Sequence, residues 1–377
     1  MNKKRIFLIL ILSLMVIAGG IIASANEKII NSMDFQGEEI RLSLEDALER
    51  ALAESSAGKT IKWNMQKAKI AYDNNYDLAR TLRTIENETN RDAMIFKLMG
   101  DFAKSQMDKN YQAELNNLKT QVKQQYFGLL QARDNMKINE DNIKVVEKLY
   151  KDTQTKFKLG MAAKQELLTA EYNYLKAQTD YEAAVNIYKK AKMGFNVFMG
   201  FDVMQEITLT DTLTEVKTTE IEIADAVSRA LINRNEVAGA EYSKEIQRLT
   251  FEKISTRYLS DTKTHIDQKV AYETAQNDYE NVFKLIEMDV RSKYLTMTEK
   301  KHAVEAGRKA VESAEEGLRL VQLTYDAGMA VLTDVQEVQT RVLQSRLGLS
   351  KAILDYNLAV DDFVDSMGVG RVTIPIM

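Results

Sequence analysis

The residue types that carry most enzyme and metal chemistry are scarce in this chain of 377 residues. It has no Cys and only two His, His265 and His302. Without Cys there can be no disulfide framework, thiolate metal site or thiol nucleophile, and two His leave few candidates for acid–base catalysis or zinc binding. The sequence also has no GxxxxGK[ST], GxGxxG or HExxH motif. We therefore expect a protein that is not an enzyme and that uses no cofactor and no metal.

The charge balance argues against nucleic acid as a partner. The chain carries 51 Lys and Arg against 55 Asp and Glu, a formal net charge of −4. A nucleic-acid-binding domain usually concentrates positive charge on one face to neutralise phosphates. No such basic stripe is present in the sequence.

The first 25 residues have the pattern of an export segment. Lys3, Lys4 and Arg5 precede an apolar run over 6–22, and the small residues Ala23-Ser24-Ala25 follow. The run is also near the short limit for crossing a bilayer. Residues 1–25 are therefore either a cleaved signal peptide or a retained N-terminal anchor, and in both cases 26–377 is exported to the cell envelope.

The residue type that most reliably breaks helices, proline, is almost absent. The only Pro is Pro375, at the extreme end of the chain. Proline stops a helix because its ring fixes φ and it has no N–H to donate. Its absence from the first 374 residues predicts long, uninterrupted helices and an elongated molecule.

Apolar residues recur every seven positions over two long stretches. The first stretch runs from Leu115 to Phe157, and the second, from Leu167 to Phe198, alternates small and large residues. A sustained heptad period indicates helices that pack along one another as in a coiled coil. The apolar positions of the first stretch are Leu115, Val122, Leu129, Met136, Ile143, Tyr150 and Phe157.

The pattern occurs twice. Gly160-Met161 and Gly328-Met329 lie 168 positions apart, and the same offset carries the first heptad series onto Phe283, Val290, Met297, Val304, Val311, Leu318 and Tyr325. Tandem repetition of one helical unit is the simplest reading. The starts of the two units align at an offset of 179, through 44–48 and 223–227.

These offsets define the expected organisation of a mainly α protein. The first repeat covers 40–200, a linker 201–221, and the second repeat 222–370. Each repeat should contain three helices, over about 43–83, 95–158 and 162–200, and over about 222–258, 266–326 and 330–368, with Gly58 able to bend the first. Alternating residues at 40–42, 207–210 and 372–374 predict minor short strands.

Taken together, the residues resemble the TolC family of outer membrane efflux proteins over about 40–370. The resemblance rests on the duplication, on the similar openings at 43–48 and 223–227, and on Phe157-x-x-Gly160 matched by Tyr325-Asp326-Ala327-Gly328. It implies the protomer of an α-helical barrel, built from long antiparallel helical hairpins. It also implies a homotrimer that serves as a passive exit conduit for an exporter.

The resemblance assigns roles to particular residues. Gly160, Met161, Gly328 and Met329 correspond to the hairpin tips where an inner-membrane adaptor protein docks, with an ABC or proton-driven pump behind it. Asp334 matches an acidic position that rings the closed pore aperture, and Glu166 takes the equivalent place in the first repeat. Carboxylates at a constriction would favour cations, although an acidic residue in the first turn of a helix is often only a surface partner of the helix dipole.

The sequence departs from the family in one respect. Family members insert two membrane strands between the first and second helices of each repeat, and such a strand needs about 9–11 residues of alternating character. Here the connections at about 84–94 and 259–265 are short and polar. We therefore expect a variant that lacks the membrane β-barrel strands and reaches the membrane through its N-terminal anchor or through partners.

Two functions follow from this reading. The first is a TolC-like efflux duct component that forms the extracytoplasmic helical conduit of an export system, located in the outer membrane by family resemblance. The alternative is a coiled-coil envelope adaptor, spacer or adhesive stalk without a conducting lumen.

Overall fold

The computed structural model describes residues 34–85, 91–217 and 221–375. The expected export segment at 1–25 lies outside these ranges. The elements are β1 (Gln36–Leu42), α2 (Leu44–Glu54), α3 (Ser56–Ile85), α4 (Arg91–Lys158), α5 (Lys164–Phe198), β2 (Gln205–Leu209), α6 (Ile223–Asn233), α7 (Asn235–Ser255), α8 (Lys263–Asp326) and α9 (Leu332–Ser366).

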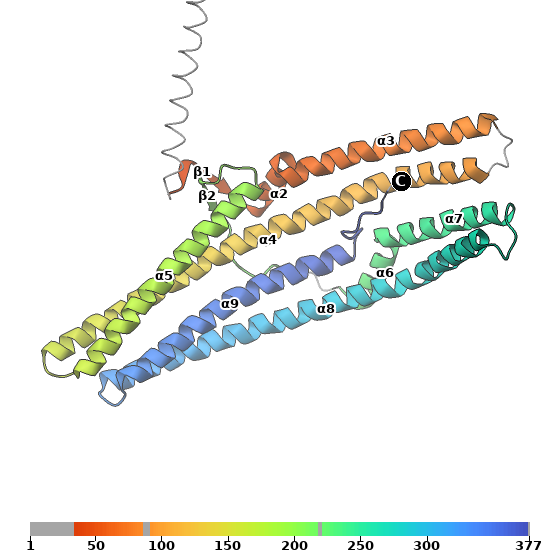
Figure 1. Cartoon of the computed structure of the whole chain (residues 1–377). Coiled ribbons are helices and arrows are strands. Elements are labelled where there is room, and N and C mark those ends of the chain that lie inside the picture. Colours follow the sequence, from red (N-terminus) through yellow and green to blue (C-terminus); the bar gives the residue numbers. More distant parts are fainter. Residues whose placement is uncertain (1–33, 86–90, 218–220, 376–377) are drawn as a thin grey trace, which may run out of the picture.

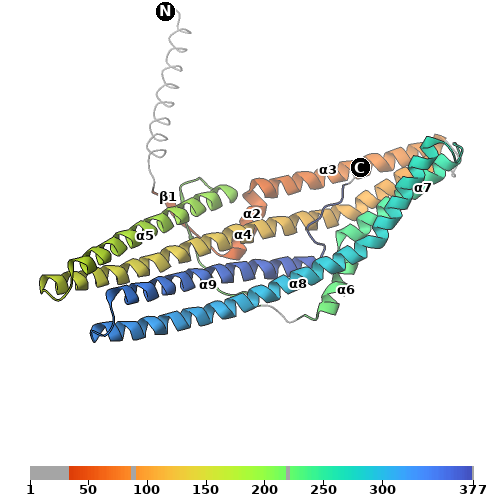
Figure 2. The same cartoon turned by 60° about the horizontal axis from the view of Figure 1, so that its bottom comes forward.

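The helices lie side by side in one layer (Figures 1 and 2). At one end α5 packs on α4, α4 on α9 and α9 on α8. At the other end α3 packs on α4, α4 on α7 and α7 on α8. Helices α4 and α8 span both ends, and α4, with 68 residues, is about 100 Å long at about 1.5 Å per residue. The predicted mainly α fold of two repeated sets of long antiparallel hairpins is confirmed.

The first helix of each repeat is interrupted; the sequence indicated a bend near Gly58 in the first repeat and none in the second. The expected helix at 43–83 is divided at Ser55 into α2 and α3, and that at 222–258 is divided at Arg234 into α6 and α7. Both residues are buried and have extended ψ angles, 154° at Ser55 and 133° at Arg234. They lie 179 positions apart, the same offset as the openings of the two repeats, so the break is part of the repeated unit.

Gly58 permits the first of these breaks. A Cβ atom at this position would lie 2.4 Å from the carbonyl oxygen of Ala51 and 2.5 Å from that of Leu52, much closer than carbon and oxygen can approach. The N–H of Gly58 donates to the hydroxyl of Ser55 at 3.0 Å. The absence of a side chain therefore lets α3 start against the last turn of α2.

Two of the three expected strands form, and they pair in parallel. Ile40 of β1 is in register with Ile207 of β2. The segment before the first helix of the first repeat therefore lies beside the segment after its last helix. The expected strand at 372–374 is not one: this segment has no ladder partner in the described residues. Between α7 and α8, residues 256–262 form a short connection without a strand; the corresponding residues 86–90 lie outside the described ranges.

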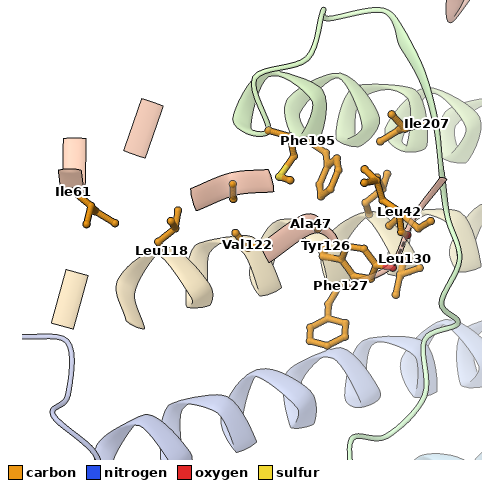
Figure 3. Packing of buried hydrophobic residues seen from close by; sticks show 14 residues of the cluster. Leu42, Ala47, Ile61, Leu118, Val122, Tyr126, Phe127, Leu130, Phe195 and Ile207 are labelled. Atoms are coloured by element: carbon orange, nitrogen blue, oxygen red, sulfur yellow. Dashed lines mark hydrogen bonds between the residues drawn. The ribbon is translucent and has the colours of Figure 1, made fainter. Parts of the chain in front are cut away.

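The largest core cluster lies where β1, β2, α2, α4 and α5 meet (Figure 3). Val122, Tyr126 and Phe195 are fully buried there, and the hydroxyl of Tyr126 donates to Asp211 at 2.6 Å. Burial raises the pKa of this phenol well above its usual value, and the nearby Asp211 carboxylate raises it further. The Tyr126 hydroxyl therefore stays protonated and joins α4 to the linker after β2.

The break in the first repeat can be tested by filling the space at Gly58. The Gly58→Ala variant should lower the free energy of unfolding by about 1–3 kcal/mol, because the added methyl group clashes with backbone oxygens. Gly128→Ala is the matched control, because nothing lies within 4 Å of a Cβ atom there, and alanine in a helix interior should stabilise by about 0.5–1 kcal/mol. Urea unfolding followed by circular dichroism would measure both, and equal effects would contradict this account of the break.

Candidate functional site

Two helical hairpins of the chain end next to one another at the same end of the layer (Figures 1 and 2). The α4–α5 turn holds Gly160, and the α8–α9 turn holds Gly328. A cluster of Leu149, Ala170, Leu332 and Val335 packs the two hairpins together just behind these turns. The ammonium of Lys156 also lies 4.1 Å from the ring centre of Tyr325. The four residues expected at the tips are thus brought to one end of the protein.

Each turn is closed by the same pair of backbone hydrogen bonds. The N–H of Gly160 donates to Phe157 at 3.0 Å and that of Met161 to Lys156 at 2.8 Å; Gly328 and Met329 repeat these bonds with Tyr325 and Thr324. This is the Schellman arrangement that ends a helix on a left-handed residue. Gly160 has φ of 73° and Gly328 has φ of 74°, so glycine is the residue that fits both places.

The tips present apolar side chains to solvent. Met161 is 72% exposed and Met329 is 77% exposed, and both are flanked by other exposed apolar residues, Leu159 and Val331. Methionine side chains are flexible and adapt to irregular partner surfaces. Exposed apolar residues gathered in one place are typical of a surface that binds another protein.

The two expected aperture carboxylates have a local role in this structure. Glu166 accepts a hydrogen bond from the N–H of Ala163 at 3.0 Å, and Asp334 accepts one from the N–H of Val331 at 3.1 Å. Both therefore satisfy a free N–H at the start of a helix and complement the helix dipole. No hydrogen bond or ion pair joins Glu166 to Asp334 within the described parts of one copy, and their place at a pore aperture stays a prediction.

The two histidines do not come together. His265 lies near the start of α8 with its ring 5.2 Å from that of Phe251, whereas His302 is exposed near the middle of α8 beside Glu305. Among the residues that the structure describes, no group of three His, Asp or Glu is placed to hold a metal ion. In the same ranges, none of the helices is both long enough and apolar enough to span a membrane.

A set of asparagines that sequence reasoning missed binds the segment after α9. Asn110 of α4 donates to the carbonyl of Ile374 at 2.7 Å and accepts from its N–H at 2.8 Å. Asn235, at the start of α7, donates to the carbonyl of Val372 at 2.9 Å. Asn116 and Asn117 bind the carbonyls of Gly370 and Arg371 in the same way. Residues 369–374 thus join α4 of the first repeat to α7 of the second.

Known proteins with similar sequence or fold include outer membrane proteins and outer membrane channels. Outer membrane protein TolC of Vibrio cholerae is 21% identical over 308 residues, which is 70% of this chain and 70% of that protein. No protein-family model matches the sequence. The similarity to TolC-type outer membrane efflux proteins that the motifs predicted is nevertheless supported by this match and by the fold.

Three solved structures illustrate the shared fold. The CmeC outer membrane channel of Campylobacter jejuni has a TM-score of 0.68 at 13% identity, over 87% of this chain and 86% of that one. A membrane protein from Pseudomonas aeruginosa gives 0.70 at 12% identity, over 87% and 90%. The outer membrane protein VceC of Vibrio cholerae gives 0.65 at 12% identity, over 87% and 97%. At these identities the likeness establishes the fold.

The local role of Asp334 predicts different results for two substitutions. Asp334→Ala removes the acceptor for the N–H of Val331, and amide hydrogen exchange over 331–336 should become about three- to fivefold faster, equivalent to about 0.6–1 kcal/mol. Asp334→Asn keeps an oxygen acceptor and should lose less than half of this protection. Glu337→Ala, which removes an exposed carboxylate that pairs with Arg341, is the control. Equal losses for the Ala and Asn variants would contradict a hydrogen-bonding role.

Proposed function

We propose that this protein is the extracytoplasmic helical conduit of an export system, assembled from three copies. The observation that carries the proposal is the single layer of helices, which has an open edge on each side. One edge is formed by α3 and α5 and the other by α8. A sheet of helices with two unpaired edges can close into a tube when the edge of one copy packs on the opposite edge of the next.

Both edges carry exposed apolar residues on the side turned away from their neighbours in the same copy. On α3, Trp63 and Ile70 lie opposite the buried Ile61; on α5, Leu168 and Leu175 lie opposite the buried Ala170. On α8 the exposed apolar residues opposite the buried Val290 and Val304 are Met288, Leu295 and Leu320. Apolar stripes of this kind are expected to be covered in the assembled protein.

If the tips of neighbouring copies lie at the same position along the tube axis, residues of the two edges also match in distance from the tips and in charge. Leu168 is eight residues after Gly160 and Leu320 is eight residues before Gly328; Lys189 and Glu299 are both 29 residues from the same glycines. Because α5 runs away from the tips and α8 runs toward them, each pair lies at one level. The apolar pair near the tips and the opposite charges farther along support a head-to-tail contact between α5 and α8.

In this assembly the tips would meet the adaptor. The six turns of three copies would form a ring that presents Met161 and Met329, and we propose that a periplasmic or extracytoplasmic adaptor protein docks on it, linked to an ABC or proton-driven pump of the inner membrane. Glu166 and Asp334, one turn into the helices after the tips, are then placed to contribute carboxylates near the aperture. We keep 40–200 and 222–370 as the two repeats, joined by the linker 201–221.

We place the protein in the cell envelope because its relatives are outer membrane channels. Residues 1–25 would direct export of the chain, either as a cleaved signal peptide or as a retained N-terminal anchor. The chain itself has no catalytic role in this proposal: it provides a passage for molecules that a pump moves. The alternative is an envelope spacer or adhesive stalk, in which the same edges close onto one another without a lumen.

The edge contact can be tested by changing one residue and then its opposite. Leu168→Glu places a charge in the apolar contact, and the copies should dissociate at micromolar concentration because each of three contacts loses about 1.5–3 kcal/mol of apolar burial. Adding Leu320→Lys should restore the assembly in part. Light scattering of the full chain in detergent gives the mass.

The control for this test is Val145→Glu, which places the same charge on the interior helix α4, where Val145 is exposed. This variant should keep the wild-type mass. A monomeric wild-type protein, or Leu168→Glu that assembles as the wild type does, would contradict the proposed contact.

The docking role of the tips predicts a second result. Because the chain has no Cys, Met161→Cys gives one site for a photoactivated cross-linker in cells that express the protein's own export partners. We expect it to capture an adaptor protein, identified by mass spectrometry, and we expect Met329→Asp to reduce the yield severalfold. Leu259→Cys, 76% exposed near the opposite end, is the matched control. Equal capture of the adaptor from position 259 would contradict docking at the tips.

A further inference from the structure

The segment after α9, residues 369–374, lies against α4 and α7 as an extended peptide, and we call it the strap. One side-chain amide, that of Asn110, binds both backbone groups of Ile374, at 2.7 Å and 2.8 Å. The amide of Asn235 donates to the carbonyl of Val372 and to Oδ1 of Asn110, each at 2.9 Å. The two asparagines thus orient each other and bind the strap backbone, as the edge of a sheet binds an added strand.

Two positions of the strap accept only particular residues. Gly370 has φ of 80°, which favours glycine, and a Cβ atom there would lie 3.0 Å from Nε of Arg234. The guanidinium of Arg371 donates to Asp365 at 2.8 Å and to Asp362 at 2.6 Å. Planar pairing with carboxylates favours arginine over lysine. The surface therefore selects glycine followed by arginine.

A third position is selected by the backbone of α7. A Cβ atom at Gly239 would lie 2.7 Å from Cδ1 of Ile374, so the missing side chain leaves the space that this isoleucine occupies. Between the selected positions, Val372 is 44% exposed and Thr373 is also exposed. The strap is therefore recognised as Gly-Arg-x-x-Ile, with two positions open to other residues.

The strap is held in a way that allows it to leave. Of its apolar side chains, Val369 and Ile374 are partly buried and Val372 is exposed. Segments held by hydrogen bonds with little apolar burial open at a lower free energy than the core does. Because the strap is tethered to α9, its effective concentration at the site is on the order of millimolar, which keeps the site occupied.

We propose that the surface formed by α4, the start of α7 and the end of α9 is a sequence-specific site for extended peptides of the pattern Gly-Arg-x-x-Ile. The strap is its intramolecular and displaceable ligand. A peptide that takes the place of the strap would bring a second chain to the junction of the two repeats. The site is formed by one copy, so it does not depend on the trimer or on the conduit proposal.

The test empties the site and then offers the strap as a free peptide. In the full chain, Gly370→Val with Ile374→Ser should open the strap; a chain that ends at Gly368 is a second opened form. Saturation-transfer NMR follows binding of the peptide of residues 368–375 to each protein in detergent. We expect a Kd of about 1 mM or lower for both opened forms.

The wild type should bind the same peptide at least about tenfold more weakly, because its own strap competes. No saturable binding to either opened form would overturn the proposal. Equal affinity of the wild type and the opened forms would also overturn it, because the peptide would then bind somewhere else.

Substitutions in the peptide test the selected positions. Gly370→Val and Arg371→Glu should each raise the Kd for the opened forms at least about tenfold. The peptide with Val372→Ala and Thr373→Ser is the matched control, because both side chains are exposed, and it should bind as the unchanged peptide does. Equal binding of the Arg371→Glu peptide would contradict the recognition.

One substitution in the protein connects binding to this surface. Adding Gly239→Leu to the opened chain fills the space of Ile374 and should abolish binding of the peptide. Gly128→Leu is the control, since nothing lies within 4 Å of a Cβ atom there, and it should leave the Kd unchanged. Unchanged binding after Gly239→Leu would overturn the assignment of the site.

Discussion

The whole structure depends on lateral contact between helices in a single layer. A helix in such a layer has neighbours only at its sides, so the free energy of its packing comes from two narrow seams. On α5 the seam toward α4 is made of Ala170, Ala177 and Ala184, all buried, and small residues let the two backbones approach closely. The same requirement operates at the outer edges of the layer, where the seam can be completed only by another copy.

The ends of the helices set where these seams begin and stop. Gly160 and Gly328 reverse the chain with matching φ angles and matching hydrogen bonds, so the two hairpins end in the same turn geometry. At the other breaks, Ser55 and Arg234 redirect the chain within each repeat. The guanidinium of Arg234 pairs with Asp289 of α8 at 2.9 Å, so the direction of α7 is tied to the long helix beside it.

The elements that local sequence determines could be predicted, and the elements that distant contacts determine could not. The lack of proline and the heptad pattern predicted the long helices. The 168-residue offset predicted the duplication and the two glycines at the tips. At the break in the second repeat, the guanidinium of Arg234 pairs with the neighbouring Glu236 and also with Asp289, which is 55 residues away and is brought close only by the fold. Alternating residues at 372–374 predicted a strand, but Asn110 binds Ile374 across 264 positions and takes the place of a neighbouring strand. For Asp334 the sequence left two roles open, at a pore aperture or as a partner of the helix dipole, and its hydrogen bond with the N–H of Val331, three residues away, supports the second role.

In the proposed assembly, the open layer of helices closes on further copies around a lumen. Electron cryomicroscopy of the full-length protein in detergent or nanodiscs tests it most directly. We expect a ring of three copies with α5 of each beside α8 of the next, a water-filled passage along the axis, and all six hairpin tips at one end. A bundle whose apolar edges close on each other without a passage, or a particle of one copy, would contradict it.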